Sequence, residues 1–121
     1  QSFFEYLEQQ LRSFDFANDR ERLIAQQVIG SLNDDGYLVR KISAISDDLL
    51  LYNDLDTRKS EIESILKRIQ DLDPPGIGAR DLRECLLIQL SRKIDEEDFQ
   101  NDAQLADLIL AHRIIDERQD H

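Results

Sequence analysis

The sequence has little of several features that mark particular classes of protein. Its single cysteine, Cys85, excludes an internal disulfide and fits a reducing cytoplasm. No apolar run reaches the roughly 18 residues that indicate a membrane-spanning helix, and no signal peptide is visible. Basic residues are also scarce, since 15 Lys and Arg stand against 26 Asp and Glu, for a net charge of −11. Because phosphates are bound by Lys and Arg, this balance disfavours nucleic acid as a direct partner and favours a basic protein surface.

Apolar residues are present at helical spacing in six stretches, and no stretch alternates in the manner of a strand. The sequence therefore predicts an all-α fold. The expected helices cover residues 2–14, 18–32, 43–52, 57–72, 79–94 and a sixth segment after Asn101. The residues expected to face a core on the fourth and fifth helices are Ile65, Leu66, Ile69, Leu82, Cys85, Leu86 and Leu90. Gln1 in place of an initiating methionine suggests a piece of a longer protein.

The chain is organised around a corner between the fourth and fifth helices, Asp73-Pro74-Pro75-Gly76-Ile77-Gly78. A residue before proline avoids the α region, so the preceding helix should end by residue 72 or 73. Pro75 and Gly76 suit the central positions of a type II turn, where proline fixes φ and glycine supplies a positive φ. Gly78 lets the chain pass closely before the next helix. We therefore predict two packed helical subdomains, residues 1–72 and 79–121, joined by a stiff elbow at 73–78.

Three charged residues at the start of the fifth helix, Arg80, Asp81 and Arg83, are candidate functional residues because they have no apolar role. Arg80 and Asp81 can hydrogen-bond across the elbow and fix its angle. Alternatively, Arg80 and Arg83 can present forked contacts to carboxylates on a partner protein. The sequence leaves both roles open.

No catalytic residue, cofactor or metal site is expected. The Gly76-x-Gly78 pair lacks the preceding strand, the third glycine and the lysine of nucleotide-binding loops. The acidic run before Gly36 does not have the spacing of an EF-hand. His112 is spaced with the apolar residues of its helix, and Cys85 lies among leucines with no histidine nearby in the sequence, so both are expected to be structural.

The corner and the helix after it resemble a known family signature. The stretch Asp-Pro-x-Gly-x-Gly-Ala-Arg-Asp-Leu-x-Glu-Cys-Leu-Leu-x-Gln-Leu, from Asp73 to Leu90, is similar to the core-binding domain of bacterial RNA polymerase sigma-54 factors. Leu32-Asn33-Asp34-Asp35-Gly36-Tyr37-Leu38 also resembles that family, although Asn33 replaces its usual aspartate. The resemblance covers roughly residues 3–117.

This resemblance implies a cytoplasmic, bacterial, non-enzymatic domain that binds core RNA polymerase as part of a transcription initiation factor. In that family, promoter DNA is read by a separate C-terminal part. An AAA+ enhancer-binding activator, driven by ATP, acts mainly through an N-terminal segment. The alternative is a helical module that binds DNA directly through the helix at 43–52. A recognition helix needs basic residues, whereas this one has none and carries Asp47 and Asp48.

Overall fold

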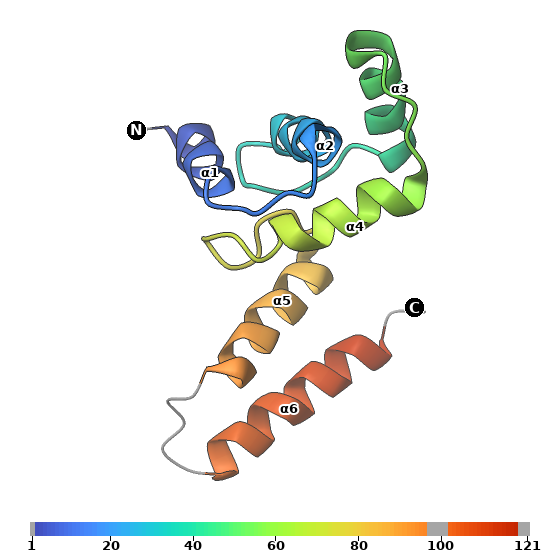
Figure 1. The fold of residues 1–121 in the computed structure, drawn as a ribbon. Helices are drawn as coiled ribbons and strands as arrows, with labels where there is room; N and C mark the ends of the chain where they lie inside the picture. The colour runs from blue at the N-terminus through green and yellow to red at the C-terminus, as the bar shows by residue number, and fades with distance from the viewer. Residues whose placement is uncertain (1, 97–101, 119–121) are drawn as a thin grey trace.

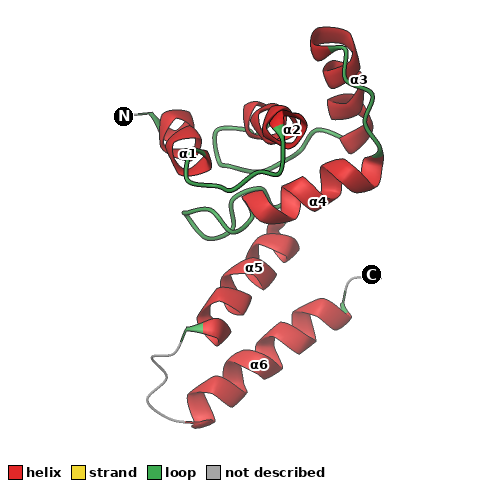
Figure 2. Cartoon of the chain, viewed as in Figure 1, coloured by secondary structure: helices red, strands yellow, loops and turns green. Residues whose placement is uncertain are grey.

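The computed structural model describes residues 2–96 and 102–118, and every regular element within them is a helix. Figure 1 shows the course of the chain and Figure 2 the distribution of helices and loops. The prediction of an all-α fold is confirmed. The helices in the described residues are α1 (Phe3–Leu11), α2 (Asp19–Gly30), α3 (Ile42–Asn53), α4 (Lys59–Ile69), α5 (Leu82–Asp95) and α6 (Asp102–Glu117).

Three helix ends differ from the sequence prediction by three residues: α1 ends at Leu11 and not at residue 14, and the other two lie beside the elbow. α4 ends at Ile69 because the backbone tightens there into bonds between residues three apart, from Asp71 N to Arg68 O and from Leu72 N to Ile69 O. α5 begins at Leu82, three residues later than predicted. Asn101, expected to precede the sixth helix, lies outside the described residues.

The buried core is one cluster built by α1–α4 and by the loops that follow α2 and α4. It forms because each of these helices turns one apolar stripe inward, as helical spacing requires. Ile65, Leu66 and Ile69 belong to this cluster. Its other buried members are Leu7, Leu11, Ile24, Ala25, Val28, Ile29, Leu32, Leu38, Ile42, Ile45, Leu49, Ile62, Leu72 and Ile77.

The elbow consists of two successive tight turns, each with a glycine at its third position. Ile77 N donates to Pro74 O at 3.1 Å, and Gly76 between them has a φ of +99°. Ala79 N then donates to Gly76 O at 3.2 Å, with Gly78 at +77°. A positive φ at the third position is the requirement of a type II turn, and glycine meets it without strain. The loop after α2 pairs with the elbow, since Gly78 N donates to Gly36 O at 2.8 Å.

α5 and α6 lie side by side in opposite directions and project from the four-helix group as a hairpin (Figure 1). In the described residues, close packing between helix backbones joins α5 only to α6. The prediction that Leu82 and Leu86 are core residues is wrong, because their exposed fractions are 64% and 39%. Cys85 and Leu90 are half-buried. The stripe is not covered because no helix of the four-helix group packs along it.

Candidate functional site

The elbow is fastened to α1 by a reciprocal pair of hydrogen bonds. The side-chain amide of Gln10 donates from Nε2 to Asp73 O at 2.8 Å. Its Oε1 accepts from Asp73 N, also at 2.8 Å. Pro74 and Pro75 follow on the surface, whereas Gly76 and Gly78 are buried. The corner is thus tied to the first helix at the residue where its turns begin.

A second fastening comes from Arg92, near the end of α5. Its Nη1 lies 2.7 Å from Asp73 Oδ1. Its Nη2 donates to Gln70 O at 3.1 Å and also to Leu72 O. The carbonyls that follow a helix end have no partner within the helix, and a positive charge complements the negative end of the helix dipole. Arg92 therefore caps α4 from outside and holds α5 against it, a set of contacts that we call the Arg92 latch.

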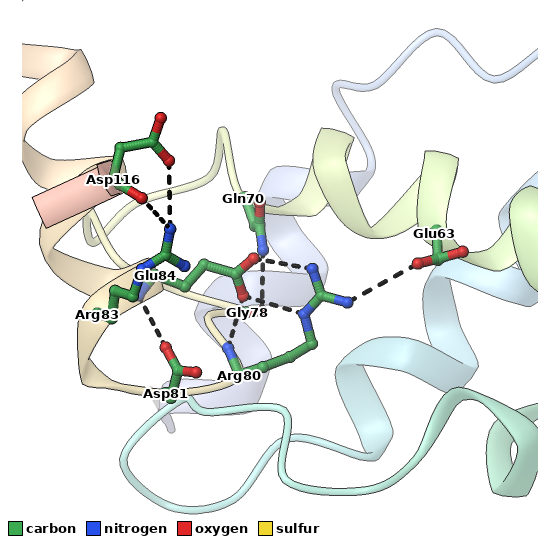
Figure 3. Close-up of polar contacts among 8 residues, drawn as sticks. All are labelled: Glu63, Gln70, Gly78, Arg80, Asp81, Arg83, Glu84 and Asp116. Carbon is green, nitrogen blue, oxygen red and sulfur yellow. Dashed lines mark hydrogen bonds and ion pairs between the residues drawn. The ribbon is translucent and has the colours of Figure 1, made fainter. Parts of the chain in front are cut away.

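Arg80 bridges the start of α5 and the middle of α4 (Figure 3). Its Nη2 lies 2.9 Å from Glu84 Oε2 and its Nε 3.2 Å from Glu84 Oε1, which is a forked pair. Its Nη1 also lies 3.8 Å from Glu63 Oε2 on α4. The guanidinium is therefore held between two carboxylates of the same chain, Glu84 and Glu63, which lie on either side of the elbow. We call this set of contacts the Arg80 bridge.

Glu84 receives enough hydrogen bonds to stay ionised despite its position. Burial favours its neutral form, but the side chain and backbone N–H of Arg80, together with the Gln70 amide, outweigh burial and lower its pKa. The backbone bond, from Arg80 N to Glu84 Oε1, is 2.7 Å long. The Gln70 amide also donates to Gly78 O at 3.1 Å, so the same group reaches the elbow (Figure 3).

The other two candidate residues are used within the chain at different places. Asp81 is the N-cap of α5, since its backbone is extended and its Oδ1 accepts from Glu84 N at 2.8 Å. This cap is why α5 starts at Leu82. Arg83 Nη2 donates to both the backbone O and Oδ1 of Asp116 on α6, each at 3.2 Å. The structure thus brings Arg80 and Asp81 together around Glu84 and turns Arg83 toward α6 (Figure 3). A direct contact of these residues with a partner stays a prediction.

Cys85 packs against the elbow. A Cβ on Gly76 would lie 2.5 Å from Cys85 Sγ, so only glycine leaves room for the thiol. Gln89 Nε2 donates to the same sulfur at 3.2 Å. Tyr37, in the loop after α2, has a raised pKa, chiefly because of its hydrogen bond with Cys85 and then because of burial. The thiol therefore joins α5, the elbow and that loop.

A groove of about 470 Å³, in which most of the lining residues are polar, lies between α4 and the hairpin. Half-buried His112 lines it from α6, and its Nε2 lies 3.1 Å from Ser91 Oγ on α5. Within the described residues, no group of three or more His, Cys, Asp or Glu side chains is placed to hold a metal ion. The remaining lining residues are Lys67, Gln70, Asp71, Glu84, Leu87, Ile88, Arg92, Asp95 and Asp116.

The family model for the sigma-54 factor core binding domain matches the chain over residues 1–121. The chain belongs to this family. The elbow, the Arg92 latch and the Arg80 bridge are thus features of a sigma-54 core-binding domain.

Curated relatives carry the name RNA polymerase sigma-54 factor. One from Pseudomonas aeruginosa is 43% identical over 86 residues, which are 71% of this chain and 17% of the relative. One from Escherichia coli K12 is 38% identical over 92 residues, 76% of this chain and 18% of the relative. One from Acidithiobacillus ferridurans is 33% identical over 115 residues, 95% of this chain and 21% of the relative. The chain spans about a fifth of the length of these relatives.

Sequence reasoning missed three residues of this sigma-54 domain that hold the elbow: Gln10, Tyr37 and Arg92. Arg92 lies in the last turn of α5, where a basic residue suits the dipole of its own helix, and that role hides its contact with α4. Gln10 is half-buried at the edge of the apolar face of a short helix. The sequence gives no sign that it meets a segment 63 residues away. For Asp81 a signal was present, because an Asp followed three residues later by Glu is typical of a helix start.

Proposed function

We propose that this domain docks its parent sigma-54 factor onto core RNA polymerase and acts as a scaffold with no enzymatic activity of its own. The observation that supports this most is the family match over the full length of the chain. Promoter recognition and the response to an AAA+ activator then belong to other parts of the parent protein. The domain's task is to keep those parts attached to the polymerase while the activator opens the promoter.

The contacts at the elbow support a scaffold of two helical subdomains, residues 1–72 and 79–121, with residues 73–78 between them. The Arg92 latch and the Arg80 bridge cross this junction, and the two hydrogen bonds of Gln10 tie its first residue to α1. A junction fixed before binding lowers the ordering cost of association, because fewer degrees of freedom are lost in the complex. We therefore expect the two subdomains to present one preorganised surface to the polymerase.

Binding of the full-length parent factor to purified core polymerase tests the proposal. Surface-immobilised polymerase should capture the intact factor, and deletion of the segment that corresponds to residues 1–121 should abolish capture. A factor that binds equally well without this segment would refute the docking role.

Charge gives a second readout. With a net charge of −11, the domain should be steered toward basic patches, so the association rate constant should fall as salt rises. A rate constant that does not change with salt would remove steering from the proposal. In a gel shift the domain alone should leave promoter DNA unbound at moderate salt, because α3 has no Lys or Arg for phosphate contacts.

A further inference from the structure

α3 has a second apolar surface in addition to the one that faces the core. Its inward stripe, Ile42, Ile45 and Leu49, is buried. Its last turn exposes three more large apolar side chains, Leu50, Leu51 and Tyr52, with exposed fractions of 52%, 73% and 74%. α3 stands at the edge of the four-helix group, on the side away from the α5–α6 hairpin (Figure 1). The described residues leave more than half of each of these residues exposed, which is costly when a polar residue would serve the helix equally well.

Negative charge brackets this apolar surface along the helix. Asp47, Leu50, Leu51 and Asp54 are spaced i, i+3, i+4 and i+7, so they follow one face of α3. Asp47 and Asp54 are exposed and form no ion pair with a described residue. The last turn has no basic residue, and Asp54 is its C-cap, so the aspartate adds to the negative end of the helix dipole. We define these four residues as the α3 outer face.

We propose that the α3 outer face is a docking surface for core RNA polymerase, where it enters an apolar groove that has a Lys or Arg at each end. The inference rests on the proposed function and narrows it to one helix. Seven residues of helix separate the two aspartates, so the two cations should lie about 10 Å apart along the groove. Burial of the two leucines supplies affinity, while the aspartates fix direction and register.

The charges argue against other occupants of this surface. Nucleic acid and anionic lipid carry negative charge and would be repelled by Asp47 and Asp54. A second copy of the chain, placed by a two-fold axis, would bring the same aspartates face to face. Asp48 is paired with Arg40 on the flank of the helix, so that position is already neutralised. A basic, apolar protein groove satisfies every exposed group of the outer face.

The experiment uses the full-length parent factor and purified core polymerase, with binding measured by interferometry at two salt concentrations. The variant Leu50→Ser/Leu51→Ser should weaken binding by about 30-fold, which is the 2 kcal/mol of an interface hot spot at 1.4 kcal/mol per decade. Val39→Ser is the matched control, because Val39 is an exposed apolar residue of the same four-helix group outside the outer face, and it should change affinity less than twofold by our estimate. Melting curves of both variants should match the unsubstituted factor, since all three side chains are exposed.

Charge reversal tests the second half of the inference. Asp47→Lys/Asp54→Lys should lower the association rate constant at low salt. The rate constant of this variant should also fall less steeply as salt rises. Unchanged affinity in the leucine variant, with normal binding by the unsubstituted factor, would overturn the inference and leave the proposed function intact. Failure of the unsubstituted factor to bind would instead refute the proposed function. If sedimentation shows a dimer of the factor that the leucine variant dissociates, the occupant is a second copy and the inference is wrong.

Discussion

Arg92→Ala is expected to release α5 from the end of α4 without unfolding the four-helix group. The guanidinium makes its contacts with Asp73, Gln70 O and Leu72 O at the junction, and it takes no part in the buried core. The substitution therefore removes attachments between the hairpin and the group while every core contact stays in place. We expect a shift in the position of the hairpin rather than a loss of helix.

The size of this effect follows from the exposure and type of the contacts. The ion pair with Asp73 is worth about 0–1 kcal/mol, because 62% of the Asp73 side chain is exposed and solvent screens the charge. A charged hydrogen bond contributes about 1.5–3 kcal/mol, but one Nη2 serves both carbonyls and water can reach them once the arginine is gone. A total of about 2–3 kcal/mol is reasonable. At 1.4 kcal/mol per factor of ten, the undocked population should rise by about 30- to 150-fold.

Distances between spin labels would measure this population directly. Labels at exposed Gln26 on α2 and Arg113 on α6, introduced as non-natural amino acids so that Cys85 stays intact, report on the hairpin relative to the group. The unsubstituted chain should give one narrow distribution and Arg92→Ala a second, broader one. Arg92→Lys should lie between them, because lysine keeps the charge but cannot fork between acceptors. Lys93→Ala should leave the distance distribution unchanged. If Arg92→Ala gave the same distribution as the unsubstituted chain, the latch would be refuted.

Three further predictions concern the core, the elbow and pH. Leu66→Ala should lower the free energy of unfolding by about 2–5 kcal/mol in urea melts, whereas the half-exposed Leu86→Ala should cost about 1 kcal/mol or less. Gly76→Ala should lower the free energy of unfolding by about 1–3 kcal/mol in the same melts, because Gly76 has a positive φ and the new Cβ would lie 2.5 Å from the Cys85 thiol. Adding Cys85→Ala removes the clash but not the backbone strain, so it should restore only part of this free energy. The pKa of Glu84 is lower in the folded protein than its ordinary value of 4.5, so the ionised side chain stabilises the fold above pH 4.5. This stabilisation is lost as the pH falls through the folded pKa. The melting temperature should therefore decrease as the pH is lowered from about 4.5, and it should decrease less steeply in Glu84→Gln.

The four-helix group was predictable because each of its helices has one dominant apolar stripe. In α4, Ile62, Ile65, Leu66 and Ile69 recur at helical spacing, and all four are buried. The same rule failed in α5, where Leu82 and Leu86 follow the spacing but face solvent. Helical periodicity shows that a face is apolar, but it carries no information on what lies against that face. Burial depends on a neighbour, and the neighbour is set by tertiary structure.

The turns of the elbow were predictable for a different reason. Proline and glycine restrict φ locally, so Pro75 and Gly76 specify their turn with little help from the rest of the chain. The contacts that orient the elbow were not predictable, since Gln10 and Asp73 are 63 positions apart and Arg92 and Asp73 are 19 apart. Long polar side chains leave no periodic trace in a sequence. The geometry of the corner was therefore accessible from the sequence, and its attachments were not.

The stabilising contacts are distributed unevenly between the four-helix group and the hairpin. All buried apolar residues in the described chain come from residues 2–79, and those of α5 and α6 are half-buried or exposed. The hairpin is held to the four-helix group instead by polar contacts of Arg80 and Arg92, both of which are partly exposed. Polar contacts of this kind are worth a small fraction of the core, so loss of one of them should undock the hairpin while the four-helix group stays folded. We therefore expect variants of the latch to change the affinity for polymerase, and variants of the core to change the amount of folded protein.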